Sequence, residues 1–297
     1  MPHEALAATL PRRDAAGVTE EAIRFGEGGR LVGILTLPAA FRLTAEPLPA
    51  FVFLNAGLLH RVGPRRLHVD LARKLAQLGF PSLRVDQSGI GDSAMQTGMS
   101  GADQVAADFR DIAKALQAHV GRRPLVVGGL CAGADSAIFM ANQDEAPVVG
   151  MFLLDPVCYP DRWFRVRSLL RIAREVIAHP IFHARLFIHR VGLVLKGHKR
   201  VDQLDLRDVP TREQTRQAFE AVGARGGRVF SLFTRYSLIY YNRQGQFRDA
   251  LGVANYDDFA TELFWPSVNH VFPTELHRTR LIGEIEAWAQ GFLPRAR

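Results

Sequence analysis

The sequence lacks most features that mark secreted, membrane-spanning or low-complexity proteins. Its two cysteines, Cys131 and Cys158, are too few for a disulfide framework in 297 residues and suit a reducing compartment. No run of roughly 18 or more apolar residues occurs, which disfavours a membrane-spanning helix. The first residues do not combine a basic start with a long apolar stretch, so we expect no secretory signal and a cytoplasmic location.

What is present is the composition of a globular protein with an excess of positive charge. Apolar residues make up 47% and charged residues 23% of the chain, which excludes disorder as the main state. At 297 residues the chain can bury a large core and carry a substantial insertion. The net charge of +7 by itself allows nucleic acid, anionic lipid or an acidic protein as a partner.

The excess charge lies in one segment. Residues 156–227 hold 14 Lys and Arg against 7 Asp and Glu, a surplus of 7 that equals the net charge of the whole chain. Within 162–200 there are ten basic residues and one acidic residue, Glu175, and apolar residues recur at helical spacing. This pattern predicts two or three basic amphipathic helices, which form either a solvated face or a docking surface for something acidic. Because the segment has few aromatics and no known reading motif, we expect no nucleic-acid binding.

Outside this segment the chain alternates between predicted strands and helices. Short apolar runs predict strands, and apolar residues three or four apart predict helices. Such alternation is typical of a mostly parallel sheet covered on both faces, which places the chain in the α/β class. The predicted strands are 21–25, 30–38, 50–55, 81–86, 124–130, 147–155, 228–234 and 260–265, and the predicted helices lie within 67–78, 105–116, 131–142 and 275–292.

The most informative segment is the strand, turn and helix around Cys131. Gly129 and Gly133 lie two residues before and after it, which gives the pattern G-x-C-x-G. A nucleophile elbow needs this composition, because small residues let strand and helix pass closely at a strained turn, and the helix N-terminus favours a thiolate. A Rossmann loop would need a third glycine and a later acidic residue, and a P-loop would need Gly-Lys-Ser/Thr. A buried, inert cysteine is the remaining alternative.

Three stretches give the chain a resemblance to α/β-hydrolases. They are LNAGLLHRVGPRR (54–66), LARKLAQLGFPSLRVDQSGIGDS (71–93) and GLCAGADSA (129–137). Within that fold the chain resembles hydrolases associated with the exosortase A system. Its elbow cysteine is similar to that of dienelactone hydrolases, and its general plan is similar to that of type II thioesterases. The resemblance implies an α/β-hydrolase fold with a mostly parallel central sheet flanked by helices.

The resemblance and the charge pattern together predict a divided core with one helical insertion. We expect an N-terminal tail over 1–18, a first part of the hydrolase core over 19–155, a basic lid over 156–227 and a second part of the core over 228–297. Because the lid sets specificity in this fold, the positive charge is expected over the mouth of the site.

In this fold the nucleophile, the acid and the histidine follow one another along the chain. His270 follows the last predicted strand and precedes the last helix, so we expect it to act as the general base. Many α/β-hydrolases carry the acid after the strand that here ends at Thr234, but no carboxylate follows it. We therefore favour Asp155, which closes the strand after the elbow helix, with Asp257 and Asp258 as alternatives.

Further candidate residues come from the elbow helix, the loop after residue 55 and the insertion. The backbone N–H groups of Ala132 and Leu58 are the predicted oxyanion donors. His179 and His183 are four residues apart, but Pro180 lies between them and no further ligand is evident, so we expect no metal site and no cofactor. The candidate contacts to an anionic substrate group or a carrier are Arg61, Arg65, Arg162 and Arg165. For Arg61 and Arg65 the equal alternative is an arginine at a helix start that faces water.

A cysteine nucleophile favours thioester chemistry, because an acyl-cysteine is itself a thioester and forms from another thioester at little cost. The sequence thus predicts a hydrolase of acyl thioesters or esters that works through Cys131, His270 and Asp155. An acidic carrier protein is the expected bearer of the acyl group, since the insertion is basic. One alternative is an acyltransferase or cyclase that passes the acyl group to an amine or hydroxyl. The other is a non-catalytic protein that contacts a lipid or membrane surface through the insertion.

Overall fold

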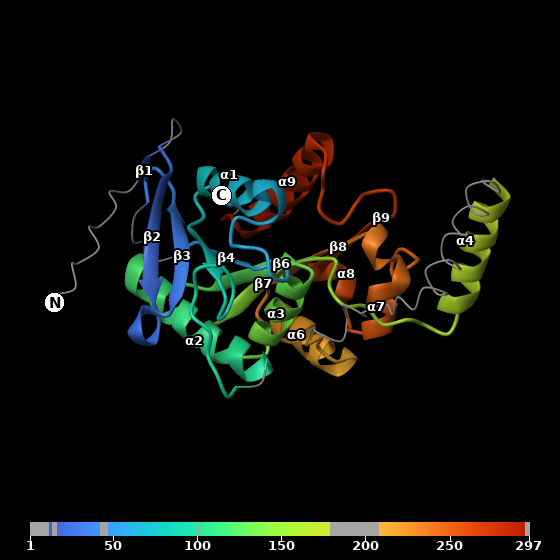
Figure 1. Ribbon diagram of the computed structural model, residues 1–297, viewed down its shortest axis with the longest axis horizontal. Coiled ribbons are helices and arrows are strands. Elements are labelled where there is room, and N and C mark those ends of the chain that lie inside the picture. The colour runs from blue at the N-terminus through green and yellow to red at the C-terminus, as the bar shows by residue number, and fades with distance from the viewer. Residues whose placement is uncertain (1–11, 14–16, 42–46, 100, 179–207, 295–297) are drawn as a thin grey trace, which may run out of the picture.

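The computed structural model describes residues 12–13, 17–41, 47–99, 101–178 and 208–294. Within these residues a nine-stranded sheet has the spatial order β1-β2-β3-β5-β4-β6-β7-β8-β9 (Figure 1). The pairs β1–β2, β2–β3 and β3–β5 are antiparallel, and every further neighbouring pair is parallel. The strands are β1 (Arg12–Arg13), β2 (Thr19–Phe25), β3 (Leu31–Leu37), β4 (Ala50–Leu54), β5 (Ser82–Asp86), β6 (Leu125–Leu130), β7 (Val148–Leu154), β8 (Arg228–Thr234) and β9 (Ala260–Trp265).

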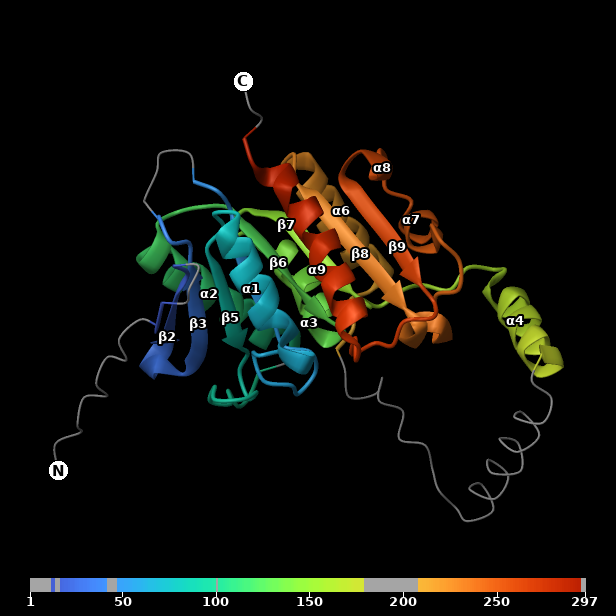
Figure 2. The same ribbon diagram turned by 90° about the horizontal axis from the view of Figure 1, so that it is seen from above.

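Helices cover both faces of this sheet (Figures 1 and 2). α1 (Leu67–Gln77) and α9 (Glu275–Ala289) share one cluster of buried apolar side chains with the strands. α2 (Gly101–Val120), α3 (Ala132–Ala141) and α6 (Arg212–Ala224) contribute to a second cluster on the opposite face. The predicted α/β-hydrolase fold, a mostly parallel sheet between two helix layers, is confirmed.

The apolar spacing in the sequence explains how these helices pack. In α1, Leu67, Leu71 and Leu75 recur every four residues and are buried against the sheet. Gly79, with a φ of +97°, supplies the left-handed turn that follows the helix.

Among the helices of the described residues, none combines the length and the apolarity needed to cross a bilayer.

The predicted lid contains two described helices with different surroundings. α4 (Phe164–Ala178) extends away from the body of the molecule in both views (Figures 1 and 2). α6 instead packs against α3, β7 and β8, with Ala218 and Phe219 fully buried. Because α6 is the crossover helix between the parallel strands β7 and β8, we restrict the proposed lid to the residues before it. Residues 179–207 of the predicted insertion lie outside the described part of the chain.

Short elements complete the fold at its two edges. α7 (Gln246–Leu251) and α8 (Tyr256–Phe259) connect β8 to β9. At the other edge, Arg12 and Arg13 of the predicted N-terminal tail form β1, which pairs with Glu20 and Thr19 of β2. The sheet therefore begins within the segment that the sequence assigned to a tail.

Candidate active site

Cys131 lies at a strained turn between β6 and α3. Its φ of +58° is in the left-handed region, which costs a non-glycine residue roughly 1–2 kcal/mol. The N–H of Cys131 donates to the carbonyl of Leu154 at 2.8 Å, and its carbonyl accepts from the N–H of Ala134 at 2.9 Å. These contacts place the half-buried thiol at the N-terminus of α3 and at the carboxyl edge of the sheet.

The glycines on either side make this turn sterically feasible. A Cβ on Gly129 would lie 2.7 Å from the carbonyl oxygen of Leu54 and 3.1 Å from the backbone of Gly133. A Cβ on Gly133 would lie 2.7 Å from the carbonyl oxygen of Asn55. The two distances of 2.7 Å are shorter than a Cβ tolerates, so β4, β6 and α3 can meet at Cys131 only because these two positions lack a Cβ.

Asp155 follows β7 directly and is completely buried. Its backbone is also left-handed, with a φ of +48°. Thr234, the last residue of β8, donates its N–H to Oδ1 and its hydroxyl to Oδ2 of Asp155, each at 2.6 Å. These two hydrogen bonds hold the buried carboxylate in one orientation. The end of β8, which carries no carboxylate of its own, therefore supplies the donors that hold the carboxylate at the end of β7.

His270 lies between β9 and α9, within reach of the other two residues. Its Nδ1 donates to Oδ2 of Asp155 at 2.7 Å, because a carboxylate can only accept. His270 also hydrogen-bonds with the side chain of Cys131. Because Nδ1 faces Asp155, Nε2 is the ring nitrogen left for this second contact. Burial lowers the pKa of His270, but the two partners outweigh burial and raise this pKa from 6.5 to about 9. The structure therefore brings together the three residues that the sequence selects as a triad.

The two alternative acids lie elsewhere. Asp257 is exposed on α8, where its carboxylate pairs with Arg248 at 3.1 Å, and Asp258 is its exposed neighbour. Sequence reasoning missed Tyr236, whose ring stacks on the imidazole of His270 with the centroids 4.1 Å apart. No motif in the sequence marks this tyrosine, because its role depends on how β8 and the loop before α9 meet in space.

A cavity of about 520 Å³ opens at Cys131, a volume typical of small-molecule sites. Leu58 and Ala132, the predicted oxyanion donors, both line it. Asn55 holds the loop that carries Leu58, since its side-chain amide donates to the carbonyl of Leu59 at 2.8 Å and to Asp86 at 3.0 Å. Both polar and apolar side chains line the rest of the cavity, among them Gln87, Gln104, Val105, Ser136, Phe139 and Tyr236.

The arginines predicted to contact substrate differ in their surroundings. Arg61 is mostly buried, and its guanidinium pairs with Asp86 and, at 2.7 Å, with Asp92. Its backbone N–H also donates to Asp86 at 2.6 Å. Two carboxylates therefore already balance the charge of Arg61 and fix this loop, and Arg61 is not among the described residues that line the cavity. The other three are exposed and are not among the described residues that line the cavity: Arg65, Arg162 and Arg165.

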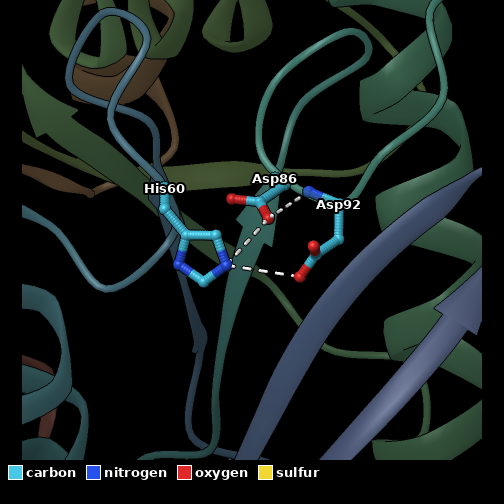
Figure 3. Close-up of side chains that lie close together, drawn as sticks. All are labelled: His60, Asp86 and Asp92. Atoms are coloured by element: carbon cyan, nitrogen blue, oxygen red, sulfur yellow. Dashed lines mark hydrogen bonds and ion pairs between the residues drawn. The ribbon is translucent and has the colours of Figure 1, made fainter.

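His60, Asp86 and Asp92 bring three atoms of metal-ligand type within 4.8 Å of one another (Figure 3). His60 Nε2 lies 3.3 Å from Asp92 and 3.6 Å from Asp86. The guanidinium of Arg61 contacts all three side chains, including His60 Nε2 at 2.7 Å. Its positive charge therefore takes the place that a metal ion would need in this cluster. The histidines weighed as ligands in the sequence, His179 and His183, lie outside the described residues.

Comparison with protein-family models matches residues 50–227, more than half of the chain, to Hydrolase_4, described as serine aminopeptidase, S33. The chain belongs to this family. It is therefore an α/β-hydrolase enzyme, as the sequence predicts. The description of the family names serine, whereas this hydrolase has cysteine at its elbow, Cys131. Comparison with curated proteins found no match.

Several solved structures resemble the hydrolase over nearly its whole length. A dienelactone hydrolase from Anabaena variabilis is 13% identical, with a TM-score of 0.56 over 94% of this chain and 100% of that one. An esterase from Pyrococcus furiosus is 11% identical, with a TM-score of 0.54 over 98% and 100%. A cold-adapted esterase from an Arctic intertidal metagenomic library is 14% identical, with a TM-score of 0.53 over 95% and 99%. At these identities the likeness establishes the fold alone.

Proposed function

We propose that this hydrolase cleaves acyl thioesters or esters through Cys131, His270 and Asp155, with an acyl-cysteine intermediate. The observation that carries the proposal is the hydrogen-bonded series from buried Asp155 through His270 to Cys131. A histidine with a pKa raised to about 9 stays protonated at neutral pH. A protonated imidazole beside the thiol favours the thiolate, which is the reactive form of cysteine.

The proposed reaction has two halves. In the first, the Cys131 thiolate bonds to the carbonyl carbon of the substrate, the bond to the leaving sulfur or oxygen breaks, and His270 gives its proton to that leaving group. In the second, neutral His270 takes a proton from water while the water oxygen bonds to the acyl carbon. The carbon–sulfur bond then breaks, which releases the carboxylic acid and restores the thiolate and the imidazolium.

The N–H groups of Leu58 and Ala132 are the proposed donors to the oxyanion that forms in each half. Ala132 is the first residue of α3, so its N–H has no partner within the helix. Asn55 positions the loop of Leu58 through its hydrogen bond to the carbonyl of Leu59. Both proposed donors line the cavity at Cys131, which is where the negative charge of the tetrahedral intermediate develops.

The cysteine nucleophile favours thioesters as substrates, including those borne by a phosphopantetheine carrier. Transfer of an acyl group from one sulfur to another changes little in free energy, so the acyl-cysteine is not a low-energy intermediate that would stop the reaction. The cavity of about 520 Å³ suits an acyl group of moderate size. Gln87 and Ser136 offer hydrogen bonds to it, and Phe139 and Val105 offer apolar contact.

Mass spectrometry of the intact protein after incubation with an acyl-coenzyme A tests this proposal. We expect an adduct of the acyl mass on Cys131 and release of the free acid. Cys131→Ala should lose both. The matched control is Cys158→Ala, because burial raises the pKa of the Cys158 thiol and keeps it inert, so this variant should keep both.

A Cys131→Ala variant with full turnover would overturn the proposal. The same incubation with an added amine separates hydrolysis from acyl transfer. Free acid as the product supports the hydrolase, whereas an amide in its place would assign the enzyme as an acyltransferase.

A further inference from the structure

Helix α4 is joined to the rest of the molecule through polar contacts on one of its sides. Asn242, which follows β8, donates its side-chain amide to the carbonyl of Phe164 at 3.0 Å and to the hydroxyl of Ser168 at 2.8 Å. Arg167 donates to Asn242 at 2.9 Å and to Asp161 at 2.6 Å. The side of α4 that carries Phe164 and Ser168 is therefore the side that faces the body of the protein.

The opposite side of α4 is an exposed apolar stripe. Leu170 lies two residues and Ile177 nine residues after Ser168, which is about half a turn and about two and a half turns along the helix. Both residues therefore lie on the side of α4 that is away from Asn242. Their exposed fractions are 55% and 80%, and that of Leu169 is 66%. An amphipathic helix normally buries such a stripe against the core, whereas here the apolar side points outward. Further exposed apolar side chains on or next to the helix are Trp163, Val166, Ile172 and Val176.

Positive charge borders this stripe. Residues 162–178 contain five arginines and one acidic residue, Glu175. At helical spacing Arg165 falls on one flank of the stripe and Arg174 on the other. An apolar face between basic flanks, with a tryptophan at one end, is the pattern of helices that lie in the interface of a membrane.

We propose that α4 binds the surface of a membrane that contains anionic phospholipid. Trp163, Leu169, Leu170 and Ile177 enter the boundary of the acyl chains, and the flanking arginines contact the lipid phosphates. An acidic protein partner fits less well, because the outermost part of α4 is apolar and the charges lie beside it. The proposal goes beyond the reaction at Cys131 and does not depend on it.

Co-sedimentation of the full chain with lipid vesicles tests the proposal. We expect binding to vesicles of phosphatidylcholine with phosphatidylglycerol to exceed binding to phosphatidylcholine alone by about tenfold or more. The variant Leu169→Asp/Ile177→Asp should lose at least about tenfold in binding to the anionic vesicles. The matched control is Leu276→Asp, at a position on α9 that is 75% exposed and away from α4, and it should bind like the original protein.

Thermal unfolding of each variant verifies that it is folded, since the substituted side chains are exposed. Equal binding of the α4 variant and the original protein to anionic vesicles would overturn the proposal, as would equal binding to both kinds of vesicle. Absence of vesicle binding, together with loss of binding to an acidic acyl carrier protein in the α4 variant, would overturn it in favour of a protein partner.

Discussion

Thr234 donates two hydrogen bonds to Asp155, one to each carboxylate oxygen. The hydroxyl of Thr234 and Nδ1 of His270 share the same acceptor, Oδ2 of Asp155. Both of these hydrogen bonds from Thr234 go to Asp155, so Thr234 acts on the site through the acid. We infer that Thr234 is a positioning residue, which fixes the carboxylate that in turn orients the imidazole.

Replacement of this hydroxyl by a methyl group should weaken the series of hydrogen bonds, and it also removes the acceptor of the Tyr236 N–H at 3.3 Å. Thr234→Val keeps the N–H donor to Oδ1 and removes the donor to Oδ2, a loss of roughly 1–3 kcal/mol. We expect kcat/KM for a small ester to fall by about tenfold, and the upper pH limit of activity to shift. The matched control is Thr36→Val in β3, since the buried hydroxyl of Thr36 has no hydrogen-bond partner among the described residues. A Thr234→Val variant with the original rate and pH profile would contradict the positioning role.

Gly133→Ala should destabilise the fold at the elbow. The added Cβ would lie 2.7 Å from the carbonyl oxygen of Asn55 and 2.8 Å from that of Leu54, both of which are backbone atoms that cannot turn aside. We expect the free energy of unfolding to fall by about 2 kcal/mol or more, measured by urea denaturation.

The control for this steric argument is Gly283→Ala in α9. A Cβ at Gly283 meets nothing within 4 Å, so alanine there should stabilise the helix by roughly 0.5–1 kcal/mol. If both alanine variants changed the stability alike, the close approach at Gly133 would not be what demands glycine.

Much of the fold, and the arrangement of the proposed triad, could be predicted from the sequence because local patterns carry them. The pattern around Cys131 requires small residues at fixed offsets, and a strand and a helix on either side confirm its context. Asp155 and His270 follow from chain order, since parallel strands bring their carboxyl ends to one edge of the sheet. The absence of a carboxylate after Thr234 itself favours Asp155 as the acid.

Other features could not be predicted because they depend on pairs of residues that are distant in sequence. From the sequence, Arg61 is a candidate for contact with the substrate. Only the fold shows that Asp86 and Asp92 form ion pairs with its guanidinium. The basic segment gives no sign that its last helix, α6, covers the sheet while α4 exposes its apolar side. Amphipathic spacing specifies that a helix has two faces but not which face meets the protein.

His68 should make the protein less stable in mild acid. This histidine is buried in α1, with its ring 5.5 Å from that of Phe53. Burial, aided by the charge of Arg84, lowers the pKa of His68 from 6.5 to about 4. Between these two values the unfolded chain binds a proton and the folded chain does not, so stability is lost as the pH falls from 6.5 towards 4. The loss attributable to this group reaches roughly 3 kcal/mol.

Urea denaturation at several pH values measures this effect. His68→Phe removes the titrating group, and its free energy of unfolding should fall less between pH 6.5 and 4 than that of the original protein. The same acid slope in both proteins would show that His68 takes up no differential proton.

His270 should set the upper pH limit of activity. Burial opposes its charge, but Asp155 and Cys131 raise the pKa of His270 to about 9, so the imidazolium and its stabilising contacts persist below that pH and are lost above it. Turnover needs this proton for the leaving group, so kcat/KM should decline as the pH rises through about 9. Asp155→Asn removes the negative partner and should move the decline to lower pH. Asp257→Asn, a change in the exposed alternative acid on α8, should leave the decline in place. If Asp257→Asn shifted the pH at which kcat/KM declines and Asp155→Asn did not, the acid of the proposed triad would be misassigned.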